Sequence, residues 1–365
     1  MSAAAFTVEE AAELRGYEFP EVKVGYNTRD VLIYNLGVGA SEPCFTFEGD
    51  KAFQGALPTF PLCLNLKGSS LDVVPFVSGQ AFPLALARVP HAAIVHGEQS
   101  ISLHKPIPTS AVEGLVHRTR IVDLEDKRSG ALLTLHTTLL DTRSGDVIAT
   151  HLSKVFLKGM GGFASPAPAD KPAGKGVSGK QTPRGAGGWG WGFGGGRRPG
   201  EVTVELKTLE IQAQLYRLSG DYNALHVDPD FAKKVGFARP VLHGLATLGF
   251  AARAMVRAVG GNQIVALRSI GGRFAAPVVP GDTLLVSIWP ASDAGQEETG
   301  GRGTDAQPRA SLSRAFEFEV RVKGRSGPMA VVISRGWAAL APEGEAAFGP
   351  KGGQGAGRAG ERSKL

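Results

Sequence analysis

The densest group of polar residues in this 365-residue chain is the stretch YRLSGDYNALHVDP, residues 216–229. Asp221, Asn223 and His226 follow a Ser-Gly turn there, a turn that we expect to end a strand. A carboxylate and an imidazole in one pocket can hold and deprotonate a water, because an unperturbed histidine is mostly neutral at pH 7. The structural alternative is an Asx-turn closed by Asp221, with His226 on the surface. The pattern alone leaves both open.

A second candidate group is the stretch ARPVLHGLATLGF, residues 238–250. Pro240 ends a loop and His243-Gly244 opens an apolar helix, which places the Gly244 amide among the unpaired donors at the positive end of the helix dipole. Such an amide suits a thioester oxygen that gains negative charge in a transition state, and glycine leaves room for the substrate. Close packing of the helix on a sheet would equally explain a glycine here.

The elements that must position these residues form two similar sets. A helix is expected at 28–37, with Thr28 as its N-cap, and another at 245–259, ended by two glycines. Alternation of apolar and polar residues predicts strands in both halves. They are Ile94–His104, Ala111–Asp123, Ala131–Asp141, Val147–Leu157, Val202–Gln214, Ile264–Phe274, Thr283–Trp289, Ser313–Val322 and Met329–Trp337. Together with short sequence echoes, this order fits an α+β fold with two copies of one sheet-on-helix unit.

The segment 159–200 separates the two sets. It contains 15 Gly and 5 Pro and buries too little apolar area to fold by itself, so we expect a linker. The expected domains are residues 10–158 and 201–341, followed by a tail over 342–365. The linker also carries a charge of +5 of the chain's total +6, which leaves the rest near neutral and argues against a basic nucleic-acid face.

The two cysteines and the terminal segments indicate which covalent links, metal sites and cellular locations can be expected. Cys44 and Cys63 have no CxxC spacing and no histidine cluster, so buried free thiols are expected rather than a disulfide or zinc site. Neither a secretion signal nor a membrane-inserted segment is indicated. The sequence ends Ser363-Lys364-Leu365 after a glycine-rich stretch, a pattern read by the peroxisomal import receptor, which predicts location in the peroxisomal matrix.

The stretch 216–232 followed by Pro240-Val-Leu-His-Gly244 closely resembles the signature of the MaoC-like enoyl-CoA hydratase 2 family. In the first half, segments 57–61, 96–99 and 103–106 resemble the degenerate N-terminal repeat of that family. The resemblance implies a tandem hotdog fold, each copy an antiparallel sheet wrapped on a helix. It also implies reversible hydration of trans-2-enoyl-CoA to (3R)-3-hydroxyacyl-CoA in peroxisomal β-oxidation.

The resemblance assigns roles residue by residue. Asp221 and His226 match the catalytic pair that holds the water, Asn223 the residue that orients it, and Gly244 the oxyanion donor. Substrate contacts are implied at His96, Gly97, Lys127, Tyr222, Ala224, Leu225 and Phe274. Lys127 suits a CoA phosphate, although Lys-Arg-Ser-Gly is also ordinary composition for a solvated turn.

The sequence departs from the family at Ala224, where proline is usual, and in an insert over residues 291–310. Alanine can adopt the backbone angle of proline, so a functional site is still expected. No cofactor or metal is expected, because hydration is redox-neutral. A hotdog acyl-CoA thioesterase and a non-catalytic acyl-CoA-binding protein are the rival functions, and a homodimer is allowed by analogy with the family.

Overall fold

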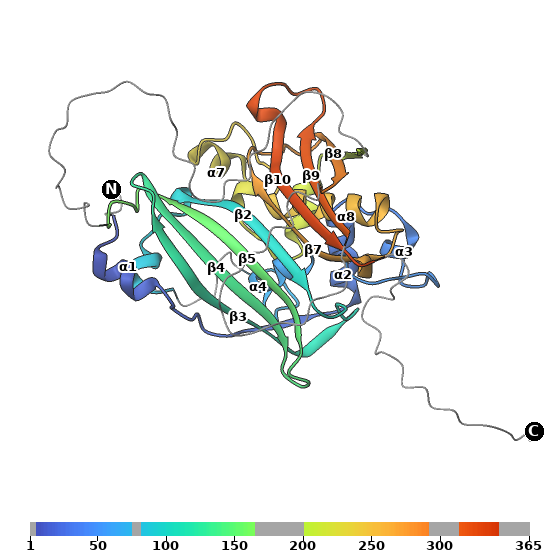
Figure 1. Ribbon diagram of the computed structural model, residues 1–365, viewed down its shortest axis with the longest axis horizontal. Coiled ribbons are helices and arrows are strands. Elements are labelled where there is room, and N and C mark those ends of the chain that lie inside the picture. Colours follow the sequence, from blue (N-terminus) through green and yellow to red (C-terminus); the bar gives the residue numbers. More distant parts are fainter. Residues whose placement is uncertain (1–4, 75–81, 165–200, 292–313, 343–365) are drawn as a thin grey trace, which may run out of the picture.

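The computed structural model describes residues 5–74, 82–164, 201–291 and 314–342 (Figure 1). The helices are α1 Val8–Leu14, α2 Thr28–Gly37, α3 Pro43–Thr46, α4 Pro61–Lys67, α5 Leu84–Ala87, α6 Gln212–Arg217, α7 Pro229–Lys234 and α8 Gly244–Ala258. The strands are β1 Val22–Tyr26, β2 Ile94–Leu103, β3 Ala111–Asp126, β4 Gly130–Asp141, β5 Val147–Lys158, β6 Val202–Lys207, β7 Leu267–Phe274, β8 Thr283–Pro290, β9 Arg314–Val322 and β10 Val331–Leu340. Short 3₁₀ turns are η1 His91–Ala93, η2 Ala224–His226, η3 Ile264–Ala266 and η5 Pro328–Ala330.

All ten strands form one antiparallel sheet in the order β1-β3-β4-β5-β2-β7-β10-β9-β8-β6. Read from its two edges, the sheet has the same strand order in both halves: β1-β3-β4-β5-β2 from one edge and β6-β8-β9-β10-β7 from the other. The two copies join where β2 pairs with β7, with Ile101 opposite Ile270. This mirrored order confirms the duplicated α+β unit.

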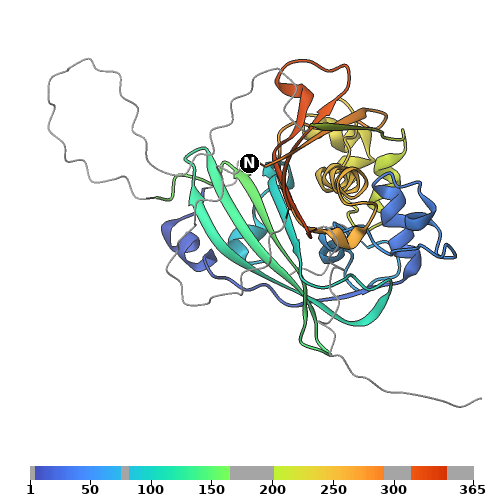
Figure 2. The ribbon, with the colours of Figure 1, turned by 45° about the vertical axis from the view of Figure 1, so that its right-hand side comes forward.

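Each copy has a helix at the position that its sheet wraps. In the second half this is α8, 15 residues long and buried along nearly its whole length. Figure 2 shows α8 almost end-on, with the strands of the second half curving past it. The counterpart in the first half, α4, has only seven residues, because it begins at Pro61 and ends at Gly68, whose φ is +63°. The first half therefore covers its sheet much less with helix.

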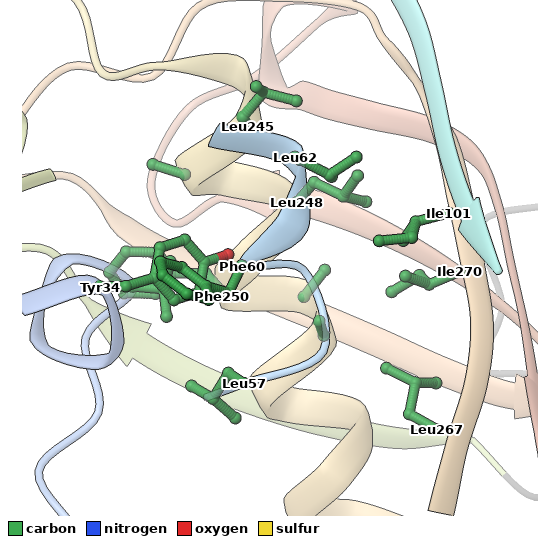
Figure 3. Close-up of a cluster of buried hydrophobic side chains, with 14 of the residues drawn as sticks. Tyr34, Leu57, Phe60, Leu62, Ile101, Leu245, Leu248, Phe250, Leu267 and Ile270 are labelled. Atoms are coloured by element: carbon green, nitrogen blue, oxygen red, sulfur yellow. The ribbon is translucent and has the colours of Figure 1, made fainter. Parts of the chain in front are cut away.

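One hydrophobic core spans the junction of the two halves (Figure 3). Tyr34 of α2 and Phe60 before α4 pack in the same cluster as Leu248 and Phe250 of α8. Polar contacts also cross this junction. The Gln212 amide donates to the carbonyls of Leu36 and Gly37 at 3.1 and 2.8 Å, and buried Arg253 pairs with Glu42 at 2.9 Å. The two halves thus fold against each other as one body.

A smaller hydrophobic cluster lies under the opposite end of the first-half sheet. It joins α1 and the region of α5 to the ends of β3, β4 and β5, through residues that include Leu14, Leu124, Leu133 and Leu157. The middle of the inner face of the first-half sheet lies between this cluster and the main core.

Most expected elements are confirmed to within three residues at each end. The strand expected over 202–214 is wrong beyond Lys207, because Gln212, Ala213 and Tyr216 are buried at helical spacing as α6. Thr28 is not the N-cap of α2. Asn27 is, and it forms a reciprocal capping box with Asp30.

Several sequence expectations fall wholly or partly outside the described residues: the linker from 165 on, the 291–310 insert from 292 on, and the tail from 343 on. Both cysteines are free thiols. Cys63 is fully buried as expected, whereas Cys44 is partly exposed. Within the described ranges, the helices are all too short or too polar to cross a membrane.

Candidate active site

Asp221 lies in a loop that follows helix α6, and not a strand as the sequence suggested. The preceding Gly220 has φ +130°, a conformation that side-chain-bearing residues rarely adopt. A Cβ there would lie 2.6 Å from Lys67 Cβ and 3.0 Å from the Cys63 carbonyl oxygen, both in α4. The loop that carries Asp221 therefore rests directly on the short helix of the first half.

Helix α4 is itself fixed by Lys67, which is only 5% exposed. Its ammonium donates to the carbonyls of Gly25 and Ser70, both at 2.6 Å, and lies 3.6 Å from Asp30. A buried ammonium is stable only with such partners, so these contacts hold α4 at a defined distance from the loop.

Hydrogen bonds fix the tautomers of two histidines beside Asp221. His226 Nδ1 lies 2.7 Å from the Val241 carbonyl oxygen and must donate to it, which leaves the Nε2 lone pair free in the neutral ring. His243 Nε2 donates to the backbone carbonyl of Asp221 at 3.1 Å. The two rings stack, with centroids 3.6 Å apart and planes 24° apart. His226 is thus oriented as an acceptor.

Burial sets the charge of this group. Desolvation lowers the pKa of His226 below its ordinary 6.5, although the charge of Asp221 opposes the shift. Desolvation likewise raises the pKa of Asp221 above its ordinary 3.8, opposed by His226. Burial places the pKa of His243 well below 6.5. Burial therefore favours neutral imidazoles at His226 and His243, while at Asp221 it disfavours the carboxylate that the neighbouring His226 favours.

The donor atoms of Asp221, His226 and His243 lie within 4.8 Å of one another, a spacing that could also serve a metal ion. Imidazole lone pairs lie in the ring plane, and a bound zinc ion lies about 2.0–2.1 Å from each nitrogen. Two nearly parallel rings stacked at 3.6 Å cannot direct both lone pairs to one such ion. The geometry suits a water held between Asp221 and His226 better than a metal.

Asn223 shapes the short turn that presents His226. The side-chain oxygen of Asn223 accepts a hydrogen bond from the backbone amide of Leu225 at 3.0 Å. The backbone amide of Asn223 donates to Asp221 Oδ1 at 3.3 Å. The Asx-turn at Asp221 is therefore present, but the expectation that His226 would then lie on the surface is wrong, because His226 is buried. Asn223 has ψ 125°, the extended conformation that precedes a proline, so the backbone around Ala224 keeps the form that proline would impose.

Gly244 lies next to this cluster, directly after His243 at the start of α8. The side chain of His243 makes no capping bond there, so the first amides of α8 keep free donors. The Phe274 ring covers Gly244 closely: a Cβ on Gly244 would lie 3.3 Å from it. His96 of the first half meets Phe274 edge-on at 5.1 Å, just before a bulge at Gly97. Both halves thus contribute to one region around Gly244.

The remaining predicted contacts are less uniform. Tyr222 is half-buried, and the guanidinium carbon of Arg217 lies over its ring, 5.1 Å from the ring centroid. Lys127 lies in the exposed turn between β3 and β4 and pairs with Glu125 at 2.8 Å. Ala131 is opposite Leu157, which is opposite Ile94 at the start of β2, so two strand spacings, about 10 Å, separate this turn from β2. Lys127 therefore lies at the exposed end of the first-half sheet, and its contact with a CoA phosphate stays a prediction.

Sequence reasoning did not assign a role to His243 or Lys67. His243 stands beside Gly244, and a histidine immediately before a helix that opens on glycine was the available signal. Lys67 gave none, because its importance comes from a contact between segments more than 150 residues apart.

Comparisons with known proteins agree with this geometry. Residues 196–306 match the MaoC like domain, and residues 25–159 match the MFE-2 hydratase 2 N-terminal domain. The peroxisomal enoyl-CoA hydratase 2 of Arabidopsis thaliana is 36% identical over 290 residues, which cover 76% of this chain and 85% of that protein. Peroxisomal multifunctional enzyme type 2 of Mus musculus is 34% identical, with 75% of this chain covering 34% of that protein. The chain belongs to the enoyl-CoA hydratase 2 family of MaoC-like proteins.

A similar solved structure is the MaoC-like dehydratase of Phytophthora capsici. It is 31% identical, superposes with a TM-score of 0.67, and the match covers 93% of this chain and all of that one. The likeness therefore extends over both halves and confirms the tandem fold that the sequence resemblance implied.

The contact of Gly220 with α4 can be tested by Gly220→Ala. The added methyl must displace α4 or the loop, so we expect at least a 10-fold loss of activity and about 1–3 kcal/mol lower free energy of unfolding. Gly236→Ala is the matched control, because Gly236 also has positive φ, +95°, but no atom lies within 4 Å of the place that its methyl group would take. Equal losses in both variants would show that backbone strain alone matters. Activity and chemical denaturation are measured for each.

Proposed function

We propose that this protein is a (3R)-specific enoyl-CoA hydratase, with Asp221 and His226 as its catalytic pair. The observation that carries the proposal is the orientation of His226: its Nδ1–H is committed to Val241, so the Nε2 lone pair is left to accept a proton beside a carboxylate. Membership in the hydratase 2 family, with homologues named enoyl-CoA hydratase 2, supports the reaction class.

The reaction follows from these positions. A water held by Asp221 and His226 adds its oxygen to C3 of the enoyl thioester and gives up a proton to the pair. The electron pair of the C2–C3 double bond moves toward the thioester oxygen, where the Gly244 amide and the positive end of α8 stabilise the charge. The pair then returns a proton to C2, so one water is consumed and the enzyme is unchanged.

A thioesterase is the rival with a specific structural argument, because the same activated water could attack the carbonyl carbon. Attack there would release free CoA. The amide of Gly244 would stabilise either oxyanion, so the helix terminus does not separate the two reactions. Both reactions take a proton from water and return one, to C2 in hydration and to the CoA sulfur in hydrolysis, so membership in the hydratase 2 family is what favours hydration.

A chiral product assay decides between these reactions. Purified full-length protein with a trans-2-enoyl-CoA should form the 3R alcohol and should dehydrate the 3R but not the 3S hydroxyacyl-CoA. The reason is that inversion at C3 moves the hydroxyl away from the fixed pair, and a 1 Å misplacement costs about a hundredfold in rate. The 3S product would refute the stereochemical assignment, and free CoA would favour the thioesterase.

The ionisation of the pair predicts a pH dependence. The productive form has Asp221 ionised and His226 neutral. Protonation of either group removes this form, so kcat/KM should fall as the pH is lowered. Burial lowers the pKa of His226, so its protonation moves to a pH below 6.5, whereas burial raises the pKa of Asp221, so its protonation occurs above 3.8 and the fall in kcat/KM should begin above 3.8. Asp221→Ala and His226→Ala should each lower turnover by roughly 10²–10⁴, and Asn223→Ala by less. A rate unaffected by either alanine would remove that residue from the mechanism.

We also propose the peroxisomal matrix as the location, with Ser363-Lys364-Leu365 bound by the import receptor. Relatives named peroxisomal support the organelle. A fluorescently tagged chain that lacks these three residues should remain in the cytosol, whereas the tagged full chain should collect in peroxisomes. Import of the truncated chain would show that another signal or a partner carries it.

A further inference from the structure

A band of polar side chains crosses the inner face of the first-half sheet. Its neighbours on that face are apolar: Ile101, Leu115 and Leu139 on the side of the main core, and Leu133 and Leu157 on the side of the smaller cluster. The band itself consists of His96 and Gln99 on β2, His151 and Ser153 on β5, Thr137 on β4 and His117 on β3. These strands lie side by side in Figure 1.

The histidines of this band have unmet hydrogen-bonding capacity. His117 is 0% exposed and His151 is 6% exposed, with ring centroids 5.5 Å apart. No ring nitrogen of either residue has a hydrogen-bond partner in the part of the chain that the structure describes, and the same holds for His96 Nε2. Buried polar groups without partners are costly and rare, so five such atoms in one band point to a polar group that binds there.

The imidazole rings of these histidines are neutral, and this limits which kinds of polar group could bind them. Burial lowers the pKa of His117 to about 3 and that of His96 to about 4, and it places that of His151 well below 6.5. A neutral imidazole offers one donor and one acceptor. An uncharged hydroxyl or ketone oxygen matches such groups, whereas a carboxylate would bring an unpaired charge into the interior.

The band begins at the candidate active site. His96 contacts Phe274, which covers Gly244. His151 is paired with Ile101, five residues further along β2, so it lies roughly 15 Å from His96 at the spacing of strand residues. That distance corresponds to about a dozen carbon–carbon single bonds. An acyl chain that extends from the thioester along the first half would reach the histidine pair with its distal part.

We propose that this band binds an oxygen substituent on the acyl chain, so that the enzyme prefers enoyl-CoA substrates with a hydroxyl or ketone group far from the thioester. The proposal rests on the hydratase function given above. It specifies the substrate class through His117 and His151, which take no part in the addition of water.

The test compares kcat/KM for trans-2-enoyl-CoA substrates of one chain length. One is unsubstituted, and the others carry a single hydroxyl at successive positions in the distal half. We expect one position to be preferred about 10-fold, the value of one well-placed hydrogen bond. In a His117→Leu/His151→Leu variant the ratio should fall to about one, whereas His151→Gln, which keeps a donor and an acceptor, should retain part of it.

His136→Leu is the matched control, because His136 lies on the opposite face of β4, across from Arg120 and Leu152, and should keep the wild-type ratio. A flat ratio in the wild type, or a preference that survives the double leucine variant, would mean that water alone fills the band. Thermal unfolding of each variant checks its fold. Calorimetric titration with saturated acyl-CoA pairs, with and without the hydroxyl, gives the same ratio without turnover. It therefore tests the band even if hydration itself is not observed.

Discussion

The site depends on one close approach between the two halves, that of Gly220 to helix α4. A side chain does not fit at Gly220 without movement, since its Cβ would lie 2.6 Å from Lys67 Cβ. The carbonyls and the carboxylate around the Lys67 ammonium hold α4 in turn. The buried Lys67 of the first half thus fixes α4, and α4 in turn supports the loop that carries the Asp221 carboxylate of the second half. The degenerate half is therefore part of the scaffold of the site, because the Asp221 loop rests on its helix at this point.

The shortness of α4 has a second consequence. In the second half, 15-residue α8 fills the inner face of its strands with apolar side chains. In the first half, α4 ends after seven residues, and the middle of the sheet carries histidines, threonine, serine and glutamine instead of a continuous apolar surface. The threonine, serine and glutamine have hydrogen-bond partners within the fold, whereas the nitrogens of His117 and His151 have none among the described residues. Buried polar groups of this kind destabilise a fold unless something binds them. The short α4 thus accompanies the polar band for which we propose an acyl-chain ligand.

The contrast between what the sequence predicted and what it missed has a physical basis. Strands such as Ala111–Asp126 and Gly130–Asp141 could be predicted because one face of each is buried. Apolar and polar residues therefore alternate along each segment, and this pattern is visible in the local sequence. Asp221, Asn223 and His226 could be proposed as a candidate site from the sequence because they lie within six residues of one another. The helix at Gln212–Arg217 was mistaken for strand, because a six-residue segment holds too few periods to separate the two patterns. Lys67 and the His226–His243 stack depend on tertiary contacts, which local spacing does not encode.

The stacked histidines also explain how a buried pair can exchange a proton. In the resting site both rings are neutral, and the bond from His243 to the Asp221 carbonyl fixes the loop without adding charge. In the proposed mechanism His226 takes a proton from water, and the imidazolium then forms beside the Asp221 carboxylate and against a neutral ring. The attraction of that carboxylate, which opposes the burial-induced fall in the pKa of His226 at rest, then stabilises the transient cation. A charged His243 would repel this cation instead, so the burial that lowers the pKa of His243 favours the proposed proton transfer.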